Sequence, residues 1–381
     1  MTDRTGTTRR TVITAAALAE PTAVLSGYTI GVTADRRRDE LAGLLESRGA
    51  RVVLAPALRI VPIADDTELR AATRACLDTP PDVVVVSTGI GMRGWLEAAE
   101  GCGLAEPLRT VLSRAYVVAR GPMVRAAIRS AGLHEQWAPE GEGYEEVVCH
   151  LTARGLAGLT VAIQLHGESQ PEYTEALERA GAQVIEVPVY RWAPPADPAP
   201  LQRLVDLITG HLVDAVTFTA APAVDALLRA AGPSSDALLD GLRTHVLAAC
   251  VGPVTAAPLR RYDIPVVVPA RARLSALVRV IVDELPKRAV SLRAAGHALT
   301  LRGHAAIVDG ELRQLAPAPM AVLRALAATP GRVMSRAALL HALPRGADEH
   351  AVEMAVARLR AGLGAPGVVQ TVMKRGYRLS T

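Results

Sequence analysis

Continuous apolar runs recur along the first part of the chain, and each is followed by a segment with helical periodicity. Residues 83–86, 161–163 and 266–268 are such runs. Strands that are apolar throughout are buried on both faces, which is typical of parallel sheets covered by helices. The pattern therefore predicts α/β domains with doubly wound parallel sheets.

The order of these segments occurs twice. Residues 49–56 recur in similar form as residues 181–188, and Gly121-Pro122 recurs as Gly252-Pro253. Each half is read as strand, helix, strand, then strand, helix, strand, helix, so we expect two lobes. In doubly wound sheets, ligands bind at the carboxyl ends of the strands, where helix N-termini present free N–H groups.

The pattern changes beyond residues 286–295, which we expect to form a linker. Residues 298–308 and 311–315 alternate as short antiparallel strands, and Asp309-Gly310 between them is a hairpin signal. Predicted helices then cover residues 319–328, residues 336–343 after an N-cap at Ser335, and residues 349–363 after Asp348, and a second hairpin covers residues 368–380.

The motifs of this C-terminal region resemble the winged-helix domain of OmpR/PhoB-type response regulators. Residues 331–340 look like the turn into the second helix, residues 352–360 like the recognition helix, and residues 371–379 like the wing. The resemblance covers residues 296–381 and implies an α+β winged helix-turn-helix domain that binds double-stranded promoter DNA. Members of this class usually bind tandem direct repeats as pairs, which implies a homodimer on DNA.

The resemblance also implies which side chains contact DNA. The expected DNA-binding residues are Arg336, Met354, Ala357, Arg358, Arg360, Lys374, Arg375 and Arg378. Arg358 is the expected base reader in the major groove, whereas the arginines and lysine outside the third helix are assigned to phosphates or the minor groove. For any single arginine, the alternative is a solvated helix face.

This region departs from the family at two places. The wing tip reads Met373-Lys374-Arg375, where the family commonly has a basic residue followed by glycine. The connection over residues 343–347 is short, and in the family this loop often contacts RNA polymerase. The short connection disfavours contact with RNA polymerase through this loop, while a partner transcription factor or RNA polymerase stays an open alternative for the protein. The preceding sequence lacks the acidic cluster of a receiver domain, so a phosphorelay is not expected.

The duplicated body resembles uroporphyrinogen-III synthase over residues 26–286. The matching features are residues 49–56, residues 181–190, Val216-Thr217-Phe218-Thr219 and residues 252–257. The resemblance implies one lobe from residues 24–62 and 193–285, and an inserted lobe from residues 64–188. The enzyme closes the linear tetrapyrrole hydroxymethylbilane, inverts its last ring and needs no cofactor.

The resemblance further implies a cleft between the lobes that accepts a polyanion. If the chain is active, Tyr190 and Thr255 are the expected catalytic residues. The expected ligand-binding residues are Arg36, Arg37, Ser87, Thr88, Gly89, Arg120, Gly121, Thr219, Ala220 and Gly252. Arginines and helix N-termini suit a substrate with eight carboxylates.

Departures at the ligand turns leave several functions open. Ala220 stands where the family usually has a hydroxyl, and Ala34-Asp35 follow Thr33 where it usually has arginine. The preferred hypothesis is a transcription regulator whose body senses a tetrapyrrole or another polyanionic small molecule. The alternatives are a bifunctional synthase that also binds DNA, and a synthase whose tail binds proteins. Fusions of this type in high-GC bacteria are associated with nitrate and nitrite assimilation.

Charge is unevenly distributed and supports the DNA hypothesis. Residues 290–381 hold twelve Arg or Lys against five Asp or Glu, a net charge of +7, while the whole chain carries +4, which leaves −3 for residues 1–289. A basic domain on a mildly acidic body is typical of a DNA-binding appendage. Aromatic residues make up only 3% of the chain, which disfavours base stacking as a binding mode.

The remaining signals concern location and metals. The cysteines, at positions 76, 102, 149 and 250, form no Cys-x-x-Cys pair, so neither a metal site nor a disulfide framework is expected. Residues 1–23 are predicted to be a disordered leader, although Arg9-Arg10 allows a twin-arginine signal as the alternative. No run reaches the ~18 apolar residues of a membrane span, and a cytoplasmic location is expected.

Overall fold

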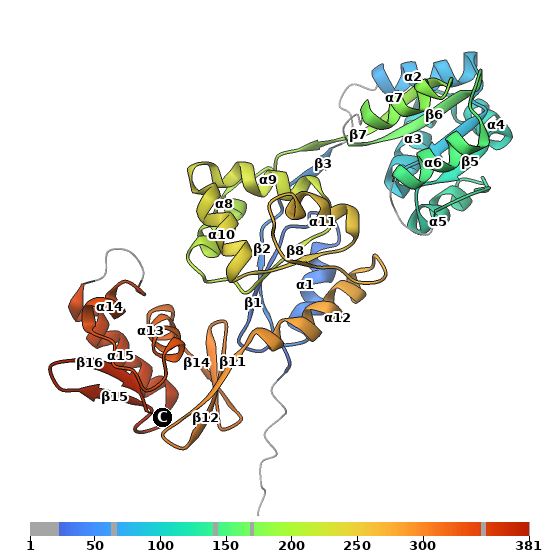
Figure 1. The fold of residues 1–381 in the computed structure, drawn as a ribbon. Coiled ribbons are helices and arrows are strands. Elements are labelled where there is room, and N and C mark those ends of the chain that lie inside the picture. Colours follow the sequence, from blue (N-terminus) through green and yellow to red (C-terminus); the bar gives the residue numbers. More distant parts are fainter. Residues whose placement is uncertain (1–22, 62–66, 140–143, 168–170, 344–347, 381) are drawn as a thin grey trace, which may run out of the picture.

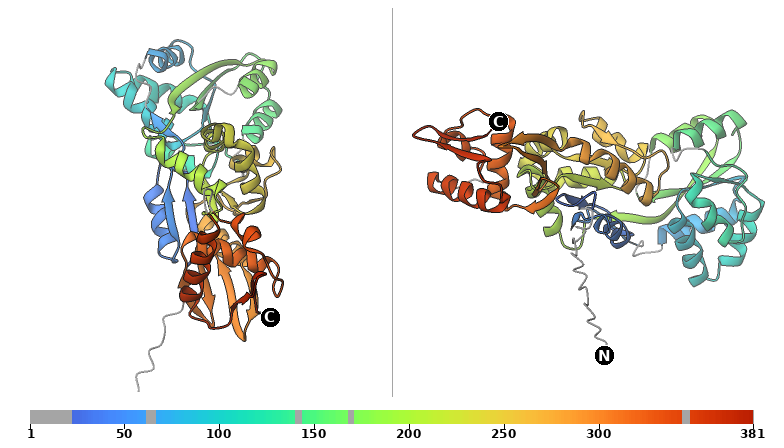
Figure 2. Two further views of the ribbon diagram at one scale, coloured as in Figure 1. Left: turned by 90° about the vertical axis from the view of Figure 1, so that its left-hand side faces the viewer. Right: turned by 90° about the horizontal axis from the view of Figure 1, so that it is seen from below.

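The chain forms three bodies, with lobe 1 between lobe 2 and a C-terminal winged-helix domain (Figures 1 and 2). This computed structural model describes residues 23–61, 67–139, 144–167, 171–343 and 348–380. Apart from Ala23, the predicted leader over residues 1–23 lies outside the described residues. The predicted fold class, two parallel-sheet lobes followed by a winged helix, is confirmed.

Lobe 1 is built around a parallel sheet with the strand order β10-β9-β8-β1-β2. Its strands are β1 (Thr29–Val32), β2 (Arg51–Leu54), β8 (Ala215–Phe218), β9 (Leu247–Cys250) and β10 (Val266–Val267). Its helices are α1 (Arg38–Glu46), α8 (Ala199–Thr209), α9 (Pro222–Ala231), η1 (Gly232–Ser234), α10 (Ser235–Thr244), α11 (Pro253–Arg260), α12 (Leu274–Glu284) and η2 (Pro286–Arg288).

Lobe 2 contains a second sheet with the order β3-β7-β6-β4-β5, in which β3 alone runs antiparallel to its neighbour. Its strands are β3 (Arg59–Val61), β4 (Val83–Val86), β5 (Tyr116–Ala119), β6 (Thr160–Gly167) and β7 (Gln183–Ala193). Its helices are α2 (Thr67–Asp78), α3 (Gly89–Gly101), α4 (Ala105–Arg114), α5 (Pro122–Ser130), α6 (Tyr144–Arg154) and α7 (Pro171–Arg179). The two lobes are joined at β3 and β7 (Figure 1).

Both sheets bury side chains on both faces, as their apolar runs predict. In β8, Val216 and Phe218 pack into one core, while Ala215 packs into the core on the opposite face. In β4, Val84 and Val85 are divided between two cores in the same way. Full burial of each of these valine and phenylalanine side chains contributes roughly 1.5–3 kcal/mol, so packing on both faces stabilises the strands.

The C-terminal domain joins an antiparallel sheet to three helices and a hairpin. The strands are β11 (Val290–Ala294), β12 (His297–Arg302), β13 (Ala305–Val308), β14 (Glu311–Gln314), β15 (Val369–Val372) and β16 (Gly376–Leu379), and the helices are α13 (Pro317–Ala328), α14 (Arg336–Leu340) and α15 (Glu349–Leu363). The predicted caps are confirmed: the Ala338 amide donates to Ser335, and the Ala351 amide donates to Asp348. Asp309 and Gly310 have φ of 49° and 91°, as a two-residue hairpin turn requires.

Three boundaries differ from the expectation. Residues 286–295, predicted as a linker, hold η2 and strand β11, so the C-terminal sheet begins at Val290. The predicted strand over residues 298–308 is broken into β12 and β13 by a turn at Gly303-His304. Strand β3, assigned to lobe 1 by the sequence, belongs to the lobe 2 sheet, because β7 continues past the predicted lobe boundary at residue 188 to Ala193 and pairs with it.

Candidate ligand site and DNA interface

The turn after β4 forms one side of the candidate ligand site in lobe 2. Thr88 caps α3, because its Oγ1 accepts the Gly91 amide at 3.0 Å. Gly91 has no room for a side chain, since a Cβ there would lie 2.7 Å from Cγ2 of Val189. The glycine therefore lets the α3 N-terminus approach β7, where Tyr190 follows Val189.

Tyr190 is held as a neutral phenol in this site. Its side chain is only 3% exposed, and burial raises its pKa to about 12, although a hydrogen bond with Thr88 and the charges of Arg120 and Arg36 act in the opposite direction. Arg36 belongs to lobe 1 and Tyr190 to lobe 2, so the turn after β1 lies within electrostatic reach of the turn after β4. A neutral phenol can donate a proton or a hydrogen bond to a ligand.

Tyr144 is a member of this site that the sequence analysis did not identify. Its hydroxyl donates to the Gln164 carbonyl at 3.0 Å, its ring stacks on Tyr173 with centroids 5.0 Å apart, and burial raises its pKa. The Arg120 guanidinium lies 5.4 Å from the centre of the Tyr144 ring. Nε of Arg120 is buried without a hydrogen-bond partner among the described residues. The sequence signal that could have identified Tyr144 is a tyrosine at the start of a helix in a chain with only 3% aromatic residues.

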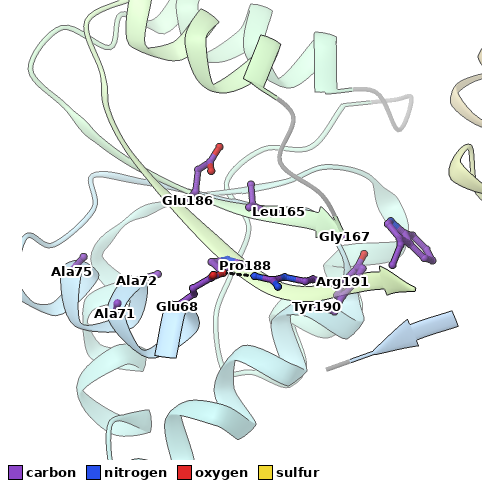
Figure 3. Close-up of a pocket in the computed structure, with 11 residues that line it drawn as sticks. Glu68, Ala71, Ala72, Ala75, Leu165, Gly167, Glu186, Pro188, Tyr190 and Arg191 are labelled. Carbon is purple, nitrogen blue, oxygen red and sulfur yellow. Dashed lines mark hydrogen bonds and ion pairs between the residues drawn. The ribbon is translucent and has the colours of Figure 1, made fainter. Parts of the chain in front are cut away.

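A cavity of about 770 Å³ opens beside Tyr190 in lobe 2 (Figure 3). It is lined by Glu68, Ala71, Ala72, Ala75, Leu165, Gly167, Glu186, Pro188, Tyr190, Arg191 and Trp192, from α2, β6 and β7. Arg191 pairs with Glu68 at 2.7 Å across it. Tyr190 belongs to both this cavity and the candidate ligand site, whereas the other residues proposed from the sequence do not line the cavity.

The exposed face of α15 forms the centre of the candidate DNA interface. Met354, Ala357 and Arg358 are spaced three and four residues apart and are all exposed, while Val356 and Leu359 on the opposite face are buried in the domain core. No described residue forms a hydrogen bond or an ion pair with Arg358. Its guanidinium is therefore available to a ligand.

The wing adds basic side chains to this interface. Lys374 and Arg375 are exposed in the turn between β15 and β16, and Lys374 adopts a left-handed φ of 59°. Neighbouring Met373 is 83% exposed. The departure from glycine in the sequence thus places a lysine in a backbone conformation that glycine adopts at lower cost.

Three of the predicted DNA contacts are engaged within the domain. Arg360 donates to the Val369 carbonyl at 3.0 Å and to Oγ1 of Thr371 at 2.8 Å, so it connects α15 to the wing. Arg336 pairs with Glu353 at 3.0 Å. Arg378 donates to Gln370 at 3.1 Å. These side chains support the shape of the interface, and Arg336 and Arg378 keep part of their exposed surface.

Comparison with known proteins identifies the body. The family model described as "Uroporphyrinogen-III synthase HemD" matches residues 39–279. The chain belongs to this family. A second model, described as "Transcriptional regulatory protein, C terminal", matches residues 310–379. The fusion of these two domains supports a role in transcription regulation.

Two similar proteins cover the body of this chain, and a third covers its C-terminal domain. The protein YjjA of Bacillus subtilis (strain 168) is 27% identical over 257 residues, which are 67% of this chain and 94% of that protein. A mutant uroporphyrinogen III synthase from the extremely thermophilic bacterium Thermus thermophilus is 28% identical, covers 68% of this chain and 100% of its own, and has a TM-score of 0.57. The RstA DNA-binding domain of Klebsiella pneumoniae, solved in complex with the RstA box, is 28% identical over 24% of this chain and 96% of that chain, with a TM-score of 0.20.

The catalytic and ligand-binding residues predicted for lobe 1 lie at the carboxyl ends of its strands. Thr219 and Ala220 are half-buried after β8, and Gly252 precedes α11, in whose first turn Thr255 is 6% exposed. Arg37 is committed elsewhere, because its guanidinium forms two hydrogen bonds of 2.6 Å with Glu40.

In lobe 2, the other predicted ligand residues follow β4 and β5. Ser87 is fully buried, Gly89 begins α3, and Gly121 precedes α5 in extended backbone. Together with Arg120 they surround the carboxyl ends of two neighbouring strands, as the sequence predicts. Within the described ranges, no group of three or more His, Cys, Asp or Glu residues could hold a metal ion. No helix of the described chain is long and apolar enough to cross a membrane.

Proposed function

We propose that the protein is a transcription regulator that binds double-stranded promoter DNA and senses a polyanionic small molecule, a tetrapyrrole in the first instance, through its synthase-like body. The exposed, unengaged Arg358 on α15 is the observation that carries the DNA proposal. It lies on the same helix face as Met354 and Ala357, and a basic wing accompanies it. This arrangement suits a helix in the major groove, with the wing on the adjacent backbone.

The sensing part of the proposal rests on the two lobes. Arg120 and Arg36 place positive charge near Tyr190, and two helix N-termini, those of α3 and α5, add favourable dipoles for carboxylates. Ala220 removes a hydroxyl from one ligand turn of lobe 1. Positive charge and helix N-termini beside an altered turn favour binding over catalysis.

DNA binding can be tested directly. Duplexes from promoters of nitrate and nitrite assimilation genes are the first choice, because the fusion resembles regulators of that process, and a duplex selected from a random pool is the second. Affinity for the selected duplex should fall steeply with salt, with a slope of about −0.9 in log K against log salt for each phosphate contact. A salt-independent affinity, or no selected sequence, contradicts DNA-specific binding.

A bifunctional synthase is the second candidate, favoured by the position of Tyr190. Its neutral phenol, hydrogen-bonded with Thr88 and near Arg120, is suited to assist the loss of a hydroxyl from hydroxymethylbilane. The test supplies fresh hydroxymethylbilane to the full chain and to Tyr190→Phe, and identifies the uroporphyrinogen isomer. Type III product that is reduced in the variant supports catalysis, whereas type I product alone refutes it.

A further inference from the structure

The turn between β12 and β13 brings the winged-helix domain against the amino end of the lobe 1 sheet. The His304 amide donates to the Gly27 carbonyl at 2.8 Å, and Nδ1 of His304 lies 3.2 Å from Oγ1 of Thr29. Thr29 is the first residue of β1. The contact is therefore made to the end of the strand that lies opposite its ligand turn.

Two arginines of the winged-helix domain extend this contact. Arg302 donates to the carbonyls of Val24 and Ser26 at 3.2 and 3.0 Å. Arg324 donates to the His211 carbonyl of lobe 1 at 3.1 Å and to the Gly303 carbonyl of its own domain at 2.6 Å. Both guanidinium groups thus bind main-chain carbonyls of lobe 1 that lie shortly before β1 or β8.

The fit between the domains depends on two glycines. A Cβ on Gly303 would overlap the carboxylate of Asp214, the residue that precedes β8. A Cβ on Gly27, which has a φ of 89°, would lie 2.9 Å from Cβ of Ala305 in β13. Each domain thus contributes a glycine at a point where the other domain leaves no space, so the surfaces are shaped to one another. We call the contact formed by Gly27, Thr29, Asp214, Gly303, His304 and Arg324 the latch.

Asp214 links the latch to both central strands of lobe 1. Its carboxylate accepts the Thr29 amide at 2.8 Å and lies 3.8 Å from Arg324. The carboxylate is largely buried, with a side-chain exposure of 16%. A buried carboxylate is stabilised by such partners. Separation of the domains would therefore remove the positive charge of Arg324 from the Asp214 carboxylate, which has little contact with solvent.

The two strands that begin at the latch end at the candidate ligand site. β1 leads to the turn that carries Arg36, and β8 leads to Thr219 and Ala220. Reciprocal hydroxyl bonds join the strands: Thr33 donates to the Thr217 carbonyl at 2.7 Å, and Thr217 donates to the Gly31 carbonyl at 3.2 Å. A shift of the ligand turns would therefore move β1 and β8 together.

We propose that the latch holds the winged-helix domain and lobe 1 as one rigid unit, and that ligand binding at the carboxyl ends of β1 and β8 alters DNA affinity through it. The coupling part rests on the proposed sensing function. The docking part does not, because it concerns the contact between the domains in the absence of ligand. The two parts are tested by different measurements on the full chain.

Docking is tested by amide hydrogen exchange in Gly303→Val, in which the added side chain meets the Asp214 carboxylate. The parent should protect the His304 amide, which donates to the Gly27 carbonyl of lobe 1, and the variant should exchange this amide at least tenfold faster. The amides of β9 should be unchanged, which shows that lobe 1 remains folded. Gly43→Val is the matched control, since a Cβ at Gly43 meets nothing within 4 Å. Rapid exchange of the His304 amide in the parent overturns docking.

Arg324→Ala provides a second variant that adds no bulk. It removes the donors to the His211 and Gly303 carbonyls and should accelerate exchange of the His304 amide. If neither this variant nor Gly303→Val alters exchange of the His304 amide, the latch is refuted. If one of the two variants also accelerates exchange of the β9 amides, lobe 1 is unfolded in that variant, and the other variant decides the result.

Coupling is tested with uroporphyrin III as the probe and a selected DNA duplex. Probe binding should change the DNA affinity of the parent by about 5- to 150-fold, the usual range of allosteric coupling, and the latch variants should lose the change while still binding both partners. An equal effect in parent and variants refutes coupling through the latch and leaves the sensing function intact. If the probe has no effect on the parent, sensing of this tetrapyrrole and its coupling are both refuted, whereas docking is judged by the exchange data alone.

Discussion

Replacement of Arg358 by alanine should weaken specific DNA binding without loss of protein stability. The side chain is exposed on α15 and has no ion-pair or hydrogen-bond partner among the described residues. Its removal should therefore change the free energy of unfolding by no more than about 0.5 kcal/mol. A bidentate contact between arginine and a base contributes about 1–3 kcal/mol of discrimination, which corresponds to a loss of about 5- to 150-fold in affinity.

The measurement is fluorescence anisotropy with a selected duplex and with a scrambled duplex at one salt concentration. Arg293→Ala is the matched control, because it makes the same change in net charge at an exposed position of β11. Arg358→Lys separates two roles: lysine keeps the positive charge but not the planar pair of donors. It should retain binding to the scrambled duplex and lose most of the preference for the selected one.

Two results would refute this reasoning. If Arg358→Ala binds the selected duplex as tightly as Arg293→Ala does, the exposed guanidinium does not contact DNA. Arg358→Ala could instead weaken binding to both duplexes equally and reduce the slope of log K against log salt by about 0.9, the value for one phosphate contact. The residue would then contact a phosphate and not a base.

The other predictions concern the wing and the latch. Arg360→Ala should destabilise the C-terminal domain by about 1–3 kcal/mol, because it removes hydrogen bonds to the wing at Val369 and Thr371. An unchanged unfolding temperature of this domain in calorimetry would contradict the prediction. Lys374→Gly should leave the stability of the domain unchanged or raise it by up to ~1 kcal/mol, because Lys374 has a left-handed φ of 59°. The same variant should reduce the salt slope of DNA binding by about 0.9, and an unchanged slope excludes a phosphate contact. Burial raises the pKa of Asp214 from 3.8 to about 6, so the folded protein binds a proton at this carboxyl more tightly than the unfolded chain does. Protonation therefore adds at most about 3 kcal/mol to the free energy of unfolding. This contribution is fully present below pH 4 and is lost as pH rises through 6. Asp214→Asn should remove that part of the pH dependence in urea unfolding, and identical profiles for parent and variant would exclude it.

Local signals in the sequence predicted the elements that local chemistry determines. Apolar runs gave the parallel strands, and Asp309-Gly310 gave the hairpin between β13 and β14 because both residues adopt a positive φ there. Ser335 and Asp348 marked helix starts through side chains that accept amides three residues later. Each of these features depends on residues close together in the chain.

Features set by distant contacts could not be predicted in this way. The alternating pattern of residues 298–308 continues through Gly303-His304, and the turn there is seen only in the pairing of Arg302 with Ala305. Tyr144 joins the candidate ligand site through contacts with Arg120 and Gln164, which come from other elements. An arginine that binds a distant residue looks the same in sequence as one without such a partner, and the ion pair between Arg336 and Glu353 is therefore visible only in the structure.

The position of the latch explains how a regulatory domain can be added to a synthase fold without blocking its ligand site. All strands of the lobe 1 sheet run in the same direction, so ligand turns occupy one edge and the opposite edge carries only strand beginnings. The winged-helix domain occupies that opposite edge, and β11 to β14 lie between lobe 1 and the β15–β16 hairpin (Figure 1). Its contacts are mainly to main-chain carbonyls and a single buried carboxylate. Such a contact involves none of the ligand-binding side chains, but it favours glycine at positions 27 and 303, where a Cβ would meet side-chain atoms of Ala305 and Asp214 in the other domain.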